Sequence, residues 1–90
     1  MKLMAHSSRL MKEYGLTAEA YQEMWEVQNG RCAICLNKQG KKKLAVDHNH
    51  KTGRIRGLLC TRCNHKLLGS AKDNPEILKR AVGYLEWHPG

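Results

Sequence analysis

A chain of 90 residues is long enough for one small domain, and a core this small is expected to need a metal or a disulfide crosslink. The chain has no apolar run of membrane-spanning length and no signal-peptide core, so residues 1–90 are expected to form a single cytoplasmic domain with no membrane partner. The formal net charge is +8, and the region from Lys38 to Lys66 holds nine basic residues and one acid. Such a region suits a polyanion, most commonly nucleic acid, although a merely solvated basic surface explains the charge as well.

Two helical segments are predicted before the first cysteine. Residues 1–13 form either a helix with a thin apolar stripe that includes Leu3 and Leu10, or a mobile basic arm. Thr17 offers its hydroxyl as the N-cap of a second helix. Asn29-Gly30 supplies a left-handed stop at the end of that helix. The positions of this helix that are expected to pack against the core are Ala20, Tyr21, Met24 and Trp25.

A β-hairpin is predicted in the middle of the chain. Leu44-Ala45-Val46 begins one short strand, and Ile55–Leu59 is its expected partner. Between them, Lys51-Thr52-Gly53 is a turn with glycine at a position where a positive φ is expected. The polar segment 37–43 is a loop, and its lysines either contact phosphates or are solvated.

Two more helices are predicted after the hairpin. Thr61 is a candidate cap for a helix that carries Cys63 and Asn64, and Gly69-Ser70 is expected to end it. Asn74-Pro75-Glu76 begins the last helix with a cap, a proline in the first turn and an acid near the positive end of the helix dipole. The expected buried stripe of this helix consists of Ile77, Leu78, Ala81, Val82 and Leu85.

The four cysteines form two Cys-x-x-Cys pairs, Cys32/Cys35 and Cys60/Cys63, separated by twenty-four residues. Two thiolates from a tight turn and two from the start of a helix can surround Zn²⁺ tetrahedrally at ~2.3 Å. In a cytoplasmic protein, paired cysteines more often hold metal than form disulfides. The alternatives are two disulfides or four separate thiols. With four protein ligands the zinc would be structural, so any chemistry must take place elsewhere.

A second group of residues suits phosphodiester hydrolysis, which needs a base for water and a cation on the phosphate. His48 is the best candidate base, because imidazole titrates near neutral pH. Asp47 is the one carboxylate of the basic region, and Asn64 offers an amide oxygen; both suit a hard ion such as Mg²⁺ or Mn²⁺. Neighbouring residues of a regular strand point to opposite faces, so irregular backbone is predicted between Asp47 and His48.

These residues carry a resemblance to a known family. Val46-Asp47-His48-x-His50, followed by Thr52-Gly53-x-Ile55-Arg56-Gly57-Leu58-Leu59-Cys60-x-x-Cys63-Asn64, resembles the recombination endonuclease VII branch of the HNH (ββα-metal) nucleases. Cys32-Ala33-Ile34-Cys35 matches the upstream half of that pattern, and the likeness runs from about Tyr14 to Glu86.

The resemblance implies an α+β fold with a small zinc-stapled treble-clef or ββα-metal core flanked by helices. It also implies a DNA endonuclease that leaves 5′-phosphate and 3′-hydroxyl ends. Asp47 and Asn64 would hold the catalytic ion, His48 would be the general base, and His50 would be an accessory residue near the scissile phosphate. The literal tripeptide that includes Asn49 is a coincidence, because the family's Asn corresponds to Asn64. Expected phosphate contacts are Lys41, Lys42, Lys43, Arg54, Arg56 and Arg62, with a hydrogen bond inside the hairpin as the alternative role of Arg56.

The sequence departs from the family pattern in two places. It ends at Gly90 without the long region that builds the dimer of the junction-resolving phage enzyme, so a four-way-junction substrate is not implied. No acid follows Asn64 within the next few residues, and His65 is either a substitute ligand or a surface residue. The alternatives to an independent nuclease are a non-catalytic treble-clef zinc module that binds nucleic acid or protein, and a homodimer or part of a phage packaging or restriction assembly. A phage- or prophage-encoded protein in the bacterial host cell is expected.

Overall fold

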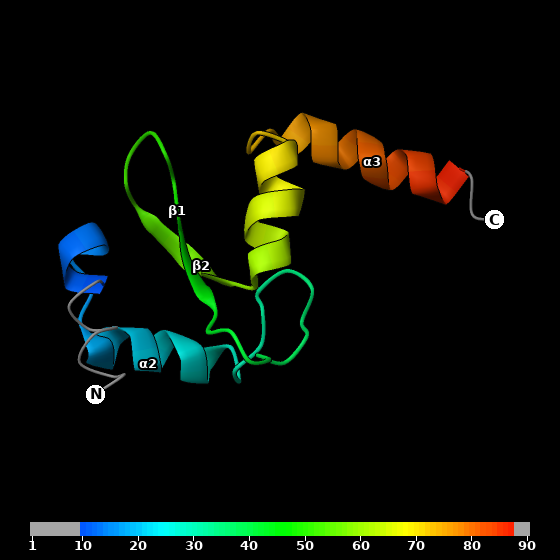
Figure 1. Cartoon of the computed structure of the whole chain (residues 1–90). Coiled ribbons are helices and arrows are strands. Elements are labelled where there is room, and N and C mark those ends of the chain that lie inside the picture. The colour runs from blue at the N-terminus through cyan, green and yellow to red at the C-terminus, as the bar shows by residue number, and fades with distance from the viewer. Residues whose placement is uncertain (1–9, 88–90) are drawn as a thin grey trace.

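The computed structural model describes residues 10–87, which form an α+β structure of helices around one antiparallel hairpin. Residues 10–14 are helical and are followed by α2 (Ala18–Val27), β1 (Ala45–His48) and β2 (Ile55–Leu59). A π-helical segment, η1 (Arg62–Leu68), and a final helix, α3 (Pro75–Trp87), complete the chain (Figure 1). The predicted fold class is therefore confirmed. Leu3 of the predicted N-terminal stripe lies outside the described residues, whereas Leu10 is buried.

Helix α2 begins and ends as its local sequence predicts. The Thr17 hydroxyl accepts a hydrogen bond of 3.0 Å from the Ala20 amide, which satisfies one of the free N–H groups of the first turn. At the other end Asn29 and Gly30 have φ values of 56° and 66°. Gly30 is also needed for space, because a Cβ atom there would lie 2.6 Å from the Trp25 ring.

The hairpin has the predicted strands and the predicted irregularity. Ala45 pairs with Leu59 and Asp47 with Gly57, but the register then shifts, so that His48 pairs with Ile55. The turn is closed by the Asn49 side-chain oxygen, which accepts hydrogen bonds from the amides of residues 51 and 52, at 2.8 and 3.0 Å. Gly53 has a φ of 77°, as expected for this turn. Asn49 therefore shapes the turn.

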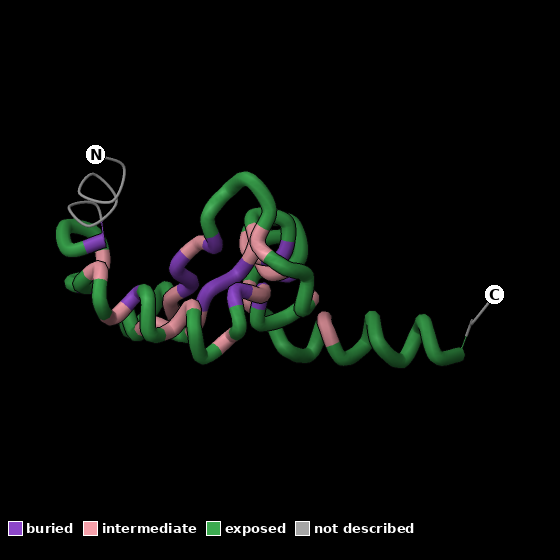
Figure 2. Tube along the Cα trace, turned by 90° about the horizontal axis from the view of Figure 1, so that it is seen from below, coloured by how far each residue is buried: buried purple, intermediate pink, exposed green. Residues whose placement is uncertain are grey.

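The core lies between α2, the hairpin and the cysteine pairs (Figure 2). The Tyr21 ring is buried in it, and the Tyr21 hydroxyl donates a 2.6 Å hydrogen bond to the Leu44 carbonyl oxygen, which ties α2 to the start of β1. Trp25 packs against the same core, as predicted for the apolar face of α2. The buried members of the core are Leu10, Leu16, Tyr21, Cys32, Leu44, Val46, Leu58, Leu59 and Cys63.

The segment after the hairpin differs from the prediction at both ends. Thr61 is itself in the right-handed helical region and makes no side-chain capping bond, so its predicted role as a cap is wrong. Gly69 also keeps helical angles, with φ −62° and ψ −44°, and the helix does not end there. The left-handed break comes later, at Lys72 and Asp73, whose φ values are 53° and 56°. The chain therefore turns toward α3 two residues beyond the predicted stop.

Helix α3 starts where predicted but is not buried. The Asn74 side-chain oxygen caps it by accepting a 2.9 Å hydrogen bond from the Glu76 amide. Among residues 75–87 none is buried: Ile77, Val82 and Leu85 are 42%, 56% and 65% exposed, Ala81 is exposed, and Leu78 is half-buried. The predicted buried stripe is therefore wrong. The helix projects away from the hairpin and α2, so no other described element covers its apolar side chains (Figures 1 and 2).

Candidate metal centre and active site

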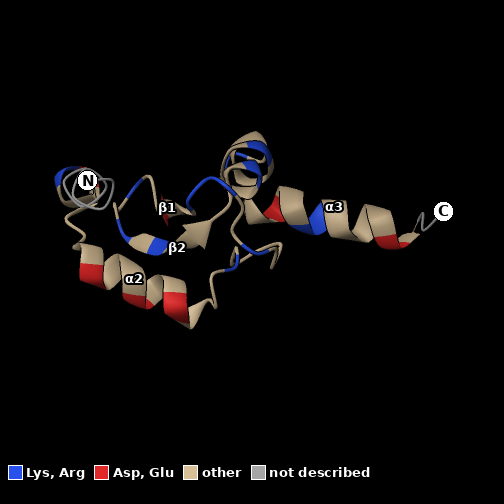
Figure 3. Cartoon of the chain, turned by 60° about the horizontal axis from the view of Figure 1, so that its bottom comes forward, with Lys and Arg blue, Asp and Glu red and all other residues tan. Residues whose placement is uncertain are grey.

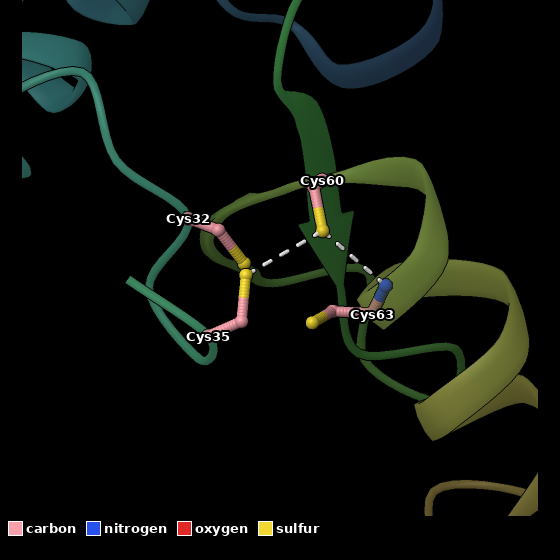
Figure 4. A group of neighbouring side chains, drawn as sticks. All are labelled: Cys32, Cys35, Cys60 and Cys63. Carbon is pink, nitrogen blue, oxygen red and sulfur yellow. Dashed lines mark hydrogen bonds between the residues drawn. The ribbon is translucent and has the colours of Figure 1, made fainter. Parts of the chain in front are cut away.

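The four cysteines converge on one point between the hairpin and η1 (Figure 4). Cys32 and Cys35 lie in a tight turn, which is closed by hydrogen bonds from the Cys32 amide to Asn37 and from the Leu36 amide to Cys32. Cys60 follows β2, and Cys63 lies in the first turn of η1. The four sulfur atoms lie within 4.8 Å of one another, and those of Cys35 and Cys60 are 3.8 Å apart. A tetrahedral zinc site with ~2.3 Å bonds separates its sulfurs by about 3.8 Å, so the cluster fits zinc.

The electrostatics of the cluster also favour a cation. Burial raises the pKa of Cys32, but backbone hydrogen bonds from Cys60, Cys35 and Ile34 and a side-chain bond from Cys35 lower it to about 6. For Cys63, burial together with hydrogen bonds and the charge of its neighbours raises the pKa to about 12. Four thiolates this close repel one another, and a divalent ion removes that repulsion. All four cysteines are free in the described chain, with no disulfide among them.

Asp47 lies on β1 beside the shift in register and is only 7% exposed. Arg56, from the facing strand, holds it with two charge-assisted hydrogen bonds, from Nε to Oδ2 at 2.7 Å and from Nη2 to Oδ1 at 2.9 Å. These bonds raise the pKa of Arg56. Of the two roles expected for Arg56, the structure therefore contains the hydrogen bond inside the hairpin.

The Asp47 carboxylate can still serve an ion. Two carboxylate oxygens offer about four acceptor positions. Arg56 uses one on each oxygen, so each oxygen retains one for a hard cation such as Mg²⁺. A hydrogen-bonded partner of this kind commonly orients a metal-binding carboxylate.

His48 is half-buried at the end of β1, immediately after the shift in register. Its ring contacts two others: the Tyr14 ring centroid is 5.4 Å away, and that of His50 is 4.8 Å away in an edge contact. A shift in register of this kind can turn a side chain away from the face that a regular strand would give it. The predicted base and the predicted accessory histidine are thus neighbours.

Asn64 is placed by the cysteine cluster. It follows Cys63 directly in η1 and is half-buried. Its backbone N–H donates a 2.9 Å hydrogen bond to the Cys60 carbonyl oxygen. Segment η1 packs against β2, and the cysteine cluster joins the start of η1 to the end of the hairpin. His65 is exposed on the same segment.

The predicted phosphate contacts are spread over the hairpin, the preceding loop and η1, whereas α2 carries acids (Figure 3). All of these residues are exposed, and Arg56 is the one among them whose side chain is hydrogen-bonded to Asp47. The exposed basic residues are Lys41, Lys42, Lys43, Arg54, Arg56 and Arg62.

Two functional candidates escaped the sequence analysis. Asp73 lies with His50 and Arg56 on the wall of a cavity of about 590 Å³. The sequence around Asp73 predicts only the N-terminal cap of α3. Tyr14 contacts His48 across thirty-four positions of sequence, and the sequence marks it only as the start of the resemblance to the family. Neither contact has a local sequence pattern that could have revealed it.

Comparisons with known proteins agree with the motif. The family model described as recombination endonuclease VII matches residues 7–87. The chain is 53% identical over 83 residues to the "Gene 59 protein" of Mycobacterium phage D29, covering 91% of this chain and 50% of that protein. It is also 53% identical over 79 residues to the "Gene 59 protein" of Mycobacterium phage L5, covering 87% and 48%.

The chain thus spans about half the length of the curated relatives it matches. No solved structure gives a significant match. Among the described residues, no helix is both long and apolar enough to span a membrane.

Proposed function

Because this chain belongs to the recombination endonuclease VII family, we propose that it is a metal-dependent DNA endonuclease of the HNH type. In this proposal it hydrolyses phosphodiester bonds with one Mg²⁺ or Mn²⁺ ion and leaves 5′-phosphate and 3′-hydroxyl ends. The cysteine cluster holds a structural zinc. The relatives are phage proteins, which supports a site of action inside the bacterial host, where the protein works alone, as a homodimer or within a larger phage assembly.

The observation that carries the proposal is the shift in hairpin register between Asp47 and His48. In a regular strand these two side chains would lie on opposite faces, and a single site could not use both. A register shift can turn two adjacent side chains toward one site, and it lies at the one place in the basic region where a carboxylate adjoins a histidine, which supports the proposal.

Each residue then has a separate task. The Nδ1 or Nε2 atom of neutral His48 accepts a proton from the attacking water. Asp47 and Asn64 supply oxygen ligands to the ion, which when bound offsets negative charge on the phosphate and the leaving oxygen. Arg56 keeps the Asp47 carboxylate oriented, and the exposed Arg54 binds the phosphate backbone.

The test is a plasmid nicking assay, with and without Mg²⁺, that compares native protein with His48→Ala and His48→Gln. A positioned general base contributes roughly 10²- to 10⁴-fold, so both variants are expected to lose at least about a hundredfold in rate. Zinc content and DNA affinity must first be confirmed as native for both variants. If either variant nicks DNA at the native rate, this centre is not a nuclease site, and a non-catalytic zinc module becomes the better account.

A further inference from the structure

Asp73 lies outside the sequence motif, yet it reaches the candidate active site. Its Oδ2 atom is 3.4 Å from Nη2 of Arg56 and 3.8 Å from Nε2 of His50. The Asp73 side chain is 27% exposed and that of Arg56 is 36% exposed. Arg56 is thus shared between two carboxylates, that of Asp47 on β1 and that of Asp73 between η1 and α3.

The backbone between η1 and α3 directs Asp73 to this place. Lys72 and Asp73 are two consecutive left-handed residues, a conformation that aspartate tolerates and lysine does not favour. The Asp73 amide donates a 3.0 Å hydrogen bond to the Leu68 carbonyl oxygen, and Ala71, two residues before Asp73, is buried. A left-handed conformation of this kind persists only where the surroundings fix it, and such residues concentrate at functional sites.

The shared guanidinium has an electrostatic consequence for the carboxylate of Asp47. Because Asp73 also binds Nη2, its carboxylate neutralises part of the positive charge of Arg56, which then acts less strongly on Asp47. Without Asp73, the guanidinium is drawn wholly to Asp47, where it opposes any cation that approaches the same oxygens. Removing Asp73 also removes one negative charge beside the site, which weakens cation binding further.

We propose that Asp73 is a positioning residue for the divalent-ion site: it holds Arg56 between two carboxylates and so keeps the Asp47 oxygens available to a metal. This inference rests on the proposed function. It gives the turn between η1 and α3 the role of orienting Arg56, which neither the cysteine cluster nor the histidines perform.

The experiment compares Asp73→Asn and Asp73→Gly with native protein. Both replacements tolerate a positive φ, so the turn is retained when the carboxylate is lost. Glu76→Gln is the matched control: it makes the same change in charge three residues away, on an exposed side chain that pairs with Lys79 and not with Arg56. Zinc content and the unfolding midpoint are measured for each variant.

Two readouts are used, and one is independent of activity. The first is Mn²⁺ binding without DNA, followed by the electron paramagnetic resonance signal of free Mn²⁺. The second is the Mg²⁺ dependence of nicking. Both Asp73 variants are expected to raise the Mn²⁺ dissociation constant and the half-saturating Mg²⁺ concentration about tenfold, the lower end of the effect of losing an outer partner of a metal site.

Unchanged Mn²⁺ affinity in both Asp73 variants would overturn the proposal. An equal shift in Glu76→Gln would also overturn it, because the effect would then come from general charge and not from Arg56. These results differ from a failure of the proposed function, in which the native protein itself nicks no DNA.

Discussion

Gln28 is predicted to be one of the most important polar side chains for stability, although it lies outside both candidate sites. Its Nε2 atom donates hydrogen bonds to the carbonyl oxygens of Arg31, at 2.7 Å, and Leu58, at 2.9 Å. Its Oε1 atom accepts a 3.0 Å bond from the Leu58 amide. The amide group therefore pairs with the outer edge of β2 much as a third strand would, and joins the end of α2 to the hairpin.

The expected cost of Gln28→Ala follows from which groups lose their partners. Leu58 is fully buried, so its amide would be left without a partner, at about 1–3 kcal/mol. The Leu58 carbonyl oxygen keeps a 3.1 Å bond from the Ala33 amide, and the half-buried Arg31 carbonyl can turn to water, so these two bonds add about 1 kcal/mol together. The free energy of unfolding should therefore fall by about 2–4 kcal/mol, a large share of the stability of a small domain.

The assay is urea unfolding of zinc-loaded protein, followed by circular dichroism. Gln28→Met keeps the side-chain volume and should lose a similar amount, which separates hydrogen bonding from packing. Gln22→Ala, on the exposed face of α2, is the control and should change stability by less than about 0.5 kcal/mol. A loss for Gln28→Ala no larger than that of the control would refute this reasoning.

Three further predictions concern the metals and the DNA. Removing zinc with a strong chelator under reducing conditions should abolish the helical circular dichroism signal, because zinc binding by four thiolates contributes on the order of 10 kcal/mol; an unchanged melting temperature would contradict this. Arg54→Ala should weaken DNA binding and lower the salt slope of log affinity by about one unit, measured by fluorescence anisotropy at several salt concentrations; an unaltered slope would mean that this residue faces away from the nucleic acid. Asp47→Ala should weaken the catalytic ion and recover part of its nicking rate at raised Mg²⁺ or with Mn²⁺, whereas His48→Ala should not, because added metal supplies no proton acceptor; equal rescue of both would contradict the division of roles.

The parts of the fold that sequence predicts well are those governed by short-range physics. The hydroxyl of Thr17 and the left-handed pair Asn29-Gly30 act within one turn of α2, so neighbouring residues in the sequence are enough to predict their effect. The hairpin turn at Gly53 is similar. The shift in register after Asp47 was predicted for a different reason, namely that one site needed two adjacent side chains.

The parts that sequence did not predict depend on distant partners. Periodicity identified the apolar side chains of α3, but it cannot say whether another element covers them. The contact of Gln28 with Leu58 spans thirty positions, and that of Arg56 with Asp73 spans seventeen. Polar pairs of this kind become visible only when the hairpin, η1 and the turn after it are placed in space.

The exposure of α3 has a consequence for local unfolding. An isolated helix of 13 residues is marginal in water, since most helix stability in proteins comes from packing. The backbone amides of α3 should therefore exchange with deuterium through local openings that leave the rest of the protein folded. The amides of β1 and β2 should exchange only when the whole domain unfolds. Deuterium uptake that separates these two classes would show that the last helix, although capped by Asn74, opens without unfolding of the core.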